Sequence, residues 1–274
     1  MKKLFALILA LAMALSLVAC GSESTENAAQ DTQESAAEAT TEEGNPWDAA
    51  VGQTYIVGTD TTFAPFEFED DNGEHTGIDI RLLDAIAEEM GFNVDWQVLG
   101  FSASVTALES YQVDAVMAGM SITDARKEKY DFSESYYDCA VAIAVAADSD
   151  YESIEDLAGK TVVAKTGTTG SQYAYEVAEE YGLTVLEVEE SALMYTYVAS
   201  GQAEACFEDY PIVQYEIQRG NVDCKVINTS DYSYPTGFAT MKDAHPELVA
   251  AFNEGFARLV ENGTYDAILA DYFG

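Results

Sequence analysis

The sequence predicts an α/β protein built as two lobes, each of them a mainly parallel sheet flanked by helices. Strand-like and helix-like segments alternate along the folded part of the chain, which is typical of α/β architecture. The alternation runs through two cycles of similar size, the second of which begins near Ser153. The predicted strands are apolar, whereas small, polar and aromatic residues follow them. Because ligands of open α/β sheets bind beyond the carboxyl ends of the strands, these residues predict a binding site.

The first cycle contains one clearly marked helix. Ile78, Leu82, Ile86 and Met90 recur every four residues and Gly91 follows them, so we predict a helix over residues 78–90. Apolar and β-branched runs predict strands at residues 55–57, 94–98 and 113–118, and we expect a short helix at 105–111. An extended passage at residues 136–139 leads into a buried strand at 140–147.

The second cycle begins with a capping-box pattern at Ser153 and Asp156. Strands are predicted at residues 161–164, 184–188, 205–207 and 225–227, and a helix over 173–181 that Gly182 ends. Pro246 begins the last long helix, because proline is tolerated in a first helical turn.

The N-terminus has the pattern of an export signal. Lys2 and Lys3 precede an uncharged, mostly apolar run at residues 4–19, which predicts a signal peptide over residues 1–19. The run is shorter than the ~20 residues that a membrane-spanning helix needs. Residues 17–21, Leu-Val-Ala-Cys-Gly, resemble the lipobox of bacterial lipoproteins, which implies a lipid on the thiol of Cys20.

Residues 20–45 are predicted to form a disordered acidic tether. After Cys20 the segment is mostly Ser, Thr, Ala, Gln and acidic residues and contains no Lys, Arg or aromatic residue, so it cannot bury enough apolar surface to fold. Its carboxylates repel one another and extend it. The Pro46-Trp47 pair marks the return to a composition that can fold.

Charge and cysteine content exclude several classes of function. The formal net charge of −37 argues against nucleic-acid binding, because the acidic surface would repel phosphates. Cys139, Cys206 and Cys224 match no zinc-ligand spacing, and we expect neither a metal nor another cofactor. These cysteines form either one disulfide and a free thiol or three free thiols.

Six stretches carry a family resemblance, at residues 58–68, 77–80, 118–127, 131–133, 262–265 and 271–274. From about Thr54 to Gly274 the chain resembles the family-3 periplasmic solute-binding proteins, the polar amino-acid-binding proteins of ABC importers. Glutamine-binding and lysine/arginine/ornithine-binding members are the most similar. One departure is Arg81, at a position that is usually acidic in the family. It lies on an outward helix face, so the departure bears on local salt bridging and not on function.

The resemblance implies the two-lobed periplasmic-binding-protein fold of type II. Lobe 1 is expected at residues 52–135 and 237–274, and lobe 2 at residues 141–231. Two strands near residues 136–140 and 232–236 form the hinge. The lobes would close over a ligand in the cleft between them, as hinge motion in periplasmic binding proteins does.

The family pattern also implies roles for the residues at the strand ends. The planar guanidinium of Arg126 suits the ligand's carboxylate. Ser121 and backbone N–H groups around Gly119 and Ser121 would complete that cradle. Thr168 and Thr169 precede a helix near Ser171, whose amino end could also bind the carboxylate. Asp209 would accept the α-ammonium, and Phe63 and Phe101 would sandwich the aliphatic stem. The side-chain pocket would be lined by Asp60, Lys165 and Glu208.

The identity of the ligand side chain stays open between two alternatives. Arg126 and Lys165 face three carboxylates, so a cationic side chain would balance the charge. However, Lys165 is similar to the lysine of glutamine binders. In that alternative Lys165 pairs with Glu208 and leaves Asp60 to accept an amide N–H.

The resemblance implies an extracytoplasmic, lipid-anchored receptor that delivers a polar L-amino acid to an ABC permease. We expect a monomer that is not an enzyme and needs no cofactor. Two alternatives are an exported dehydratase acting on prephenate-like acids and an amino-acid sensor. Against catalysis, His75 and His245 lie in peripheral segments, and the sequence contains no Gly-x-Ser-x-Gly or His-Glu-x-x-His motif.

Overall fold

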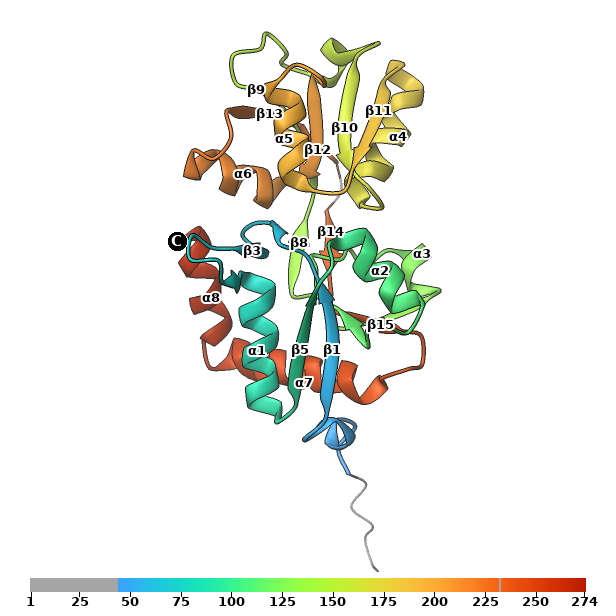
Figure 1. The fold of residues 1–274 in the computed structure, drawn as a ribbon, viewed down its shortest axis with the longest axis vertical. Helices are drawn as coiled ribbons and strands as arrows, with labels where there is room; N and C mark the ends of the chain where they lie inside the picture. The colour runs from blue at the N-terminus through green and yellow to red at the C-terminus, as the bar shows by residue number, and fades with distance from the viewer. Residues whose placement is uncertain (1–43, 232) are drawn as a thin grey trace, which may run out of the picture. The chain divides into compact units, whose positions relative to one another are not determined.

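The computed structural model of the chain describes residues 44–231 and 233–274. The predicted signal peptide at residues 1–19, the lipidation site at Cys20 and the tether up to residue 43 lie outside the described residues. Within the described part, no helix is long and apolar enough to cross a bilayer. The described residues form two lobes, each with a sheet flanked by helices, which confirms the predicted fold class (Figure 1).

The first lobe is built on a five-stranded sheet in the order β5-β1-β6-β15-β7. Its strands are β1 (Thr54–Thr59), β5 (Asn93–Val98), β6 (Ala115–Val116), β7 (Tyr130–Phe132) and β15 (Ala239–Met241). One face, with Tyr55 and Val57, packs against α1 (Ile78–Met90), α7 (Pro246–Glu261) and α8 (Thr264–Phe273). The other face, with Ile56, packs against α2 (Phe101–Glu109). Strand alternation thus divides the apolar residues of β1 between two cores.

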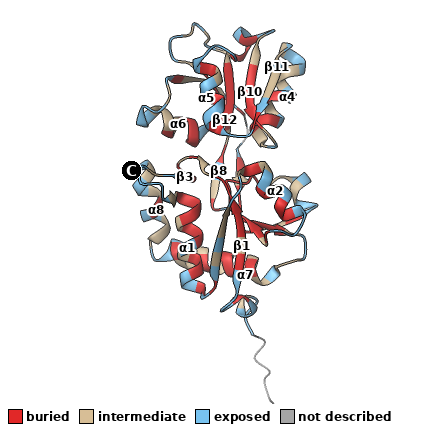
Figure 2. Cartoon of the chain, in the orientation of Figure 1, coloured by how far each residue is buried: buried red, intermediate tan, exposed pale blue. Residues whose placement is uncertain are grey.

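The second lobe has a five-stranded sheet in the order β11-β10-β12-β9-β13. Its strands are β9 (Val141–Ala146), β10 (Thr161–Lys165), β11 (Thr184–Val188), β12 (Ala205–Asp209) and β13 (Cys224–Thr229). Helix α4 (Thr169–Tyr181) covers one face, and α5 (Ser191–Ala199) and α6 (Tyr210–Arg219) cover the other. Both faces are therefore buried, and Figure 2 shows the central strands of this sheet as mostly buried.

Two strands connect the lobes. β8 (Tyr137–Cys139) and β14 (Tyr234–Thr236) form an antiparallel pair in which Tyr234 lies opposite Cys139. The chain passes from the first lobe to the second through β8 and returns through β14 (Figure 1).

Both sheets are mainly parallel, as predicted, but each contains one strand that runs against the other four. β9 runs antiparallel to β12 and β13, and β15 runs antiparallel to β6 and β7. These two strands are reversed because the chain crosses between the lobes twice, through β8 and β14. β9 and β15 each begin directly after a connecting strand. The amino end of β9 therefore lies where β12 has its carboxyl end, and the amino end of β15 lies where β6 has its carboxyl end. A strand that leaves this edge of its sheet must run against strands that arrive at it.

Most predicted elements are present, with differences at their ends. The helix at residues 78–90 and the strand at 184–188 have the predicted bounds. The helix expected at 105–111 instead begins at Phe101, and the one expected at 173–181 begins at Thr169 because the Thr168 side chain caps it. The strand expected at 113–118 is confined to Ala115–Val116. Helices α5 and α6 were not predicted, and a separate helix, α8, follows the long helix that Pro246 begins.

The remaining elements are short. They are η1 (Asp48–Ala50), η2 (Ile154–Leu157), α3 (Asp124–Lys127) and a small sheet of β2 (Thr62–Phe63), β3 (Glu67–Glu69) and β4 (His75–Thr76). The predicted capping box of Ser153 and Asp156 is present at η2. Cys139, Cys206 and Cys224 are buried free thiols, which decides between the two cysteine alternatives. Arg81 pairs with Asp271 of α8 at 2.8 Å, so it forms a local salt bridge.

Candidate functional site

The predicted site residues meet around one small cavity between the two lobes. The cavity has a volume of about 20 Å³, which is room for about one water molecule. It is lined by Phe63, Phe101, Ala118, Gly119, Ser121, Arg126, Lys165, Thr168, Thr169, Glu208 and Asp209. All of these except Ala118 were singled out in the sequence. Asp60 is the one predicted site residue that does not line the cavity.

Arg126 lines this cavity and reaches across to the second lobe. Its guanidinium donates to the carbonyl oxygens of Ser121 at 2.9 Å and Gly167 at 3.0 Å, and it lies 5.5 Å from the ring centroid of Phe101. Burial lowers the pKa of Arg126 from its usual value, and an arginine stays charged even so. A guanidinium has five N–H groups, so donors remain for an anion.

The amino end of α4 forms the cavity wall next to Arg126, which donates to Gly167 directly before the N-cap Thr168. The Thr168 hydroxyl accepts the N–H of Ser171 at 3.1 Å, which caps the helix. The Thr169 hydroxyl lies 3.2 Å from that of Ser121, so the two lobes also meet at this point. The N–H groups of a first helical turn have no partners within the helix and carry the positive end of its dipole, so an anion is favoured here.

The backbone of Gly119 differs from its predicted role. Its N–H donates to Oδ2 of the buried Asp79 at 2.8 Å, so this N–H is not available to a ligand and the carbonyl is the remaining polar group. Gly119 has a φ of 57°, and a Cβ atom here would lie 2.4 Å from Cε1 of Phe63. Only glycine fits this position without displacing the phenyl ring.

Lys165 and Asp60 form a buried ion pair across the lobes. The Lys165 ammonium donates to Oδ2 of Asp60, and each side chain is 3% exposed. Asp60 Oδ1 also accepts the N–H groups of Thr61 and Thr62. Burial would raise the pKa of Asp60, but the Lys165 charge and these hydrogen bonds outweigh it and lower the pKa. The alternative in which Lys165 pairs with Glu208 is therefore not the arrangement found.

Glu208 and Asp209 end β12 on the cavity wall, and both are buried. Glu208 Oε1 accepts the Asp209 N–H at 2.9 Å, and Asp209 Oδ1 accepts the hydroxyl of Tyr234 in β14. Burial raises the pKa of Asp209 to about 7, and the neighbouring Glu208 adds to the shift. Burial likewise raises the pKa of Glu208, although Lys165 opposes that shift. A cation at this wall would stabilise both carboxylates.

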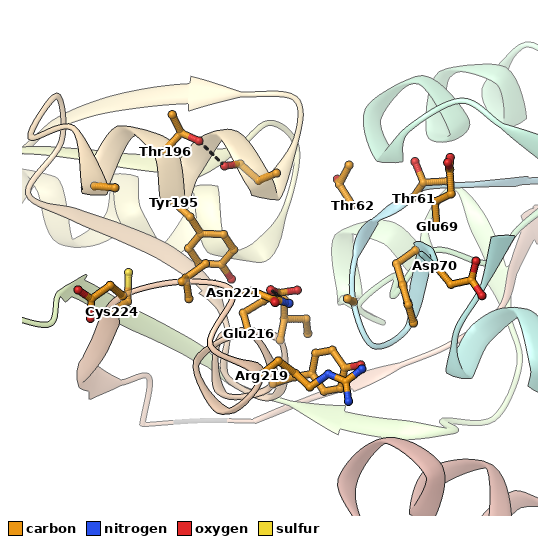
Figure 3. Close-up of a pocket in the computed structure, with 18 of the residues that line it drawn as sticks. Thr61, Thr62, Glu69, Asp70, Tyr195, Thr196, Glu216, Arg219, Asn221 and Cys224 are labelled. Carbon is orange, nitrogen blue, oxygen red and sulfur yellow. Dashed lines mark hydrogen bonds between the residues drawn. The ribbon is translucent and has the colours of Figure 1, made fainter. Parts of the chain in front are cut away.

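A larger crevice of about 660 Å³ also lies between the lobes, but it contains none of the predicted site residues. Figure 3 shows Thr61, Thr62, Glu69 and Asp70 on one side of it and Tyr195, Glu216 and Arg219 on the other. Its only cation among these lining residues, Arg219, packs on the Tyr215 ring. The small cavity, with its convergent buried charges, is the better candidate for recognition of a small polar molecule.

Sequence reasoning missed two residues that hold the site together. Asp79 binds the N–H of Gly119, and Tyr234 binds Asp209. Asp79 carries a usable signal, since it is a carboxylate among the apolar residues of the buried face of α1. For Tyr234 no pattern in the sequence indicates that β14 would pass beside the end of β12.

Comparison with known proteins decides the family. Residues 55–274 match the family described as bacterial extracellular solute-binding proteins, family 3. The chain belongs to this family. The lysine/arginine/ornithine-binding periplasmic protein of Escherichia coli (strain K12) is 31% identical to this solute-binding protein over 233 residues, which are 82% of this chain and 89% of the relative.

Solved structures share the fold of this solute-binding protein. An ancestral arginine-binding protein bound to arginine is 35% identical with a TM-score of 0.75, covering 81% of this chain and 98% of that one. The same kind of protein bound to glutamine is 34% identical with a TM-score of 0.74 and the same coverage. An ancestral amino-acid-binding protein described as a precursor of cyclohexadienyl dehydratase is 34% identical with a TM-score of 0.73, covering 81% and 96%.

Proposed function

We propose that this solute-binding protein captures a polar L-amino acid between its lobes and delivers it to an ABC permease. The observation that carries the proposal is the convergence of complementary charges on one cavity, which Arg126 and the amino end of α4 line together with Asp209. A zwitterion needs a cationic partner for its carboxylate and an anionic partner for its ammonium, and these groups supply both.

The carboxylate of the ligand would bind Arg126, Ser121 and the first N–H groups of α4. Its α-ammonium would bind Asp209 and the carbonyl of Gly119, whose N–H is already used by Asp79. Phe63 and Phe101 line the same cavity and would pack on the aliphatic stem. Because the cavity has a volume of only about 20 Å³, an amino acid can enter only after the lobes part at β8 and β14.

The preferred ligand is an amino acid with a basic side chain. Lys165 and Asp60 neutralise each other, so the cavity keeps Arg126 against the two buried carboxylates Glu208 and Asp209. A zwitterion adds no net charge, whereas an arginine, lysine or ornithine side chain balances the second carboxylate. The name of the Escherichia coli relative, for lysine, arginine and ornithine, supports the same class.

Glutamine is a second candidate, and one comparison favours it. A similar ancestral arginine-binding protein has been solved with glutamine bound. The amide of glutamine could donate to the buried Oε2 of Glu208.

Anchoring completes the proposal. We infer that the chain is exported, that Cys20 carries a lipid, and that the acidic segment up to residue 45 tethers the two lobes outside the cytoplasmic membrane as a monomer. The support is the lipobox pattern and the extracellular family to which the chain belongs.

The test is isothermal titration of ligand-stripped protein with each of the twenty amino acids and ornithine. We expect tight binding of arginine, lysine or ornithine. Binding of glutamine alone would favour the second candidate, and no heat with any amino acid would contradict the proposal. Turnover of prephenate belongs in the same series, because a buried acid with the pKa of Asp209, about 7, is also suited to general acid catalysis.

A further inference from the structure

Two buried carboxyl groups lie beneath the candidate site, and neither has a role in the ligand contacts proposed above. Asp79, in the first turn of α1, is 0% exposed, and Glu67, on β3, is 1% exposed. The backbone N–H of Asp79 donates to the carbonyl of Phe66 at 2.8 Å, so the start of α1 is fixed against the strand that carries Glu67. Burial of two acidic side chains in one place is costly unless each finds a partner.

Asp79 connects the ligand site to the strand between the lobes. Its Oδ2 accepts the N–H of Gly119 at 2.8 Å and the hydroxyl of Tyr136 at 2.9 Å. Gly119 lines the candidate cavity, and Tyr136 directly precedes β8. The orientation of one carboxylate thus sets the position of a residue that the proposed ligand contacts.

The two carboxyl groups lie close enough for a hydrogen bond between them. Two carboxylates have no donor, so this bond requires one proton. Oε2 of Glu67 and Oδ1 of Asp79 are both buried, and neither receives a bond from an N–H or hydroxyl of another described residue. Burial and the charge of Asp79 raise the pKa of Glu67 well above its usual value. Burial also raises the pKa of Asp79, to about 7, but its bonds from Gly119 and Tyr136 favour the ionised form.

Charged and titratable groups from other elements surround the pair. Asp60 and Lys165 face Glu67 and act on its charge in opposite directions. On the side of Asp79 the titratable neighbours are Tyr136, Cys139 and Tyr265. Of these three, Tyr136 donates a hydrogen bond to Asp79.

We propose that Glu67 carries the shared proton and that the Glu67–Asp79 pair positions Gly119 for ligand binding, an inference that rests on the proposed function. Gly119 lies close against Phe63, since a Cβ atom there would lie 2.4 Å from the phenyl ring. A turn of the Asp79 carboxylate would release the Gly119 N–H, and Gly119 and Phe63 would then shift at the cavity wall. Glu67 is a positioning residue that acts through Asp79.

Two substitutions of similar size separate the donor role of Glu67 from its packing. Glu67→Gln keeps a neutral donor toward Asp79, and we expect its affinity for arginine to stay within about threefold of wild type. Glu67→Met fills similar space without a donor, and we expect a loss of at least about tenfold, because the buried Asp79 is left unsatisfied. Glu69→Gln, at an exposed position on the same strand, is the control and should bind as wild type does.

Infrared difference spectroscopy detects the proposed proton on Glu67 directly and needs no ligand. At neutral pH the wild type minus Glu67→Gln spectrum should contain a protonated carboxyl band. Its absence, an equal loss of affinity in Glu67→Gln and Glu67→Met, or full affinity in Glu67→Met would each overturn the inference. If the wild type shows the band but binds no amino acid, the proposed function fails and the shared proton stands.

Discussion

The ion pair between Asp60 and Lys165 provides the sharpest test of how the lobes hold each other. Each side chain is 3% exposed, and the two come from different lobes, so Asp60→Ala leaves the Lys165 ammonium buried without a counter-ion. Removing one partner of a buried pair costs about 3–5 kcal/mol. The N–H groups of Thr61 and Thr62 lose an acceptor as well.

This cost applies to the closed arrangement, because parting of the lobes lets water reach Lys165. We therefore expect Asp60→Ala to weaken ligand binding by about 3 kcal/mol, on the order of a hundredfold, and to change the free energy of unfolding much less. Isothermal titration with the best ligand measures the affinity, and thermal unfolding without ligand measures the stability.

Two further variants complete this test. Asp60→Ala combined with Lys165→Met removes both charges, so most of the lost affinity should return if the pair serves closure. Asp95→Ala removes an exposed carboxylate of the same lobe and should leave affinity unchanged. An Asp60→Ala protein that binds as tightly as wild type would refute the reasoning.

Three other predictions concern the cavity and the anchor. Gly119→Ala should weaken binding on the order of a hundredfold, since the φ of 57° adds backbone strain and the new Cβ would lie 2.4 Å from Phe63. Gly220→Ala is the control and should keep full affinity, because Gly220 also has a positive φ, of 74°, but nothing lies within 4 Å of its Cβ. Equal affinities of the two variants in titrations would contradict this prediction. Burial raises the pKa of Asp209 to about 7, so its carboxylate gains a proton as the pH falls below that value. The affinity for the ligand, measured by titration, should therefore decline in acid, and Asp209→Asn should lose this pH dependence. Cys20→Ala should release the protein from membranes in cell fractionation, and its retention there would count against lipidation.

The chemical groups of the site could be predicted from the sequence, because their types and order are local properties. Asp209 ends a recognisable strand, and Arg126 and the threonines at the start of α4 come after one. The carboxyl ends of parallel strands gather at one edge of a sheet. The pairing of these groups could not be predicted, since it depends on which side chains of the two lobes approach each other. Lys165 had two possible carboxylate partners in the sequence, and only the packing across the lobes selects Asp60.

By itself, the sequence determined the α/β class, the two lobes, the bounds of helices with clear periodicity such as α1, and the residue types around the cavity. These follow from apolar spacing, from glycine and proline positions and from charge, all of which are written along the chain. The tertiary structure alone decided the mixed direction of the sheets, the Asp60–Lys165 pair and the burial of Glu67 beside Asp79. Each of these depends on contacts between segments far apart in the chain, whose approach is set by how the lobes pack and not by local pattern.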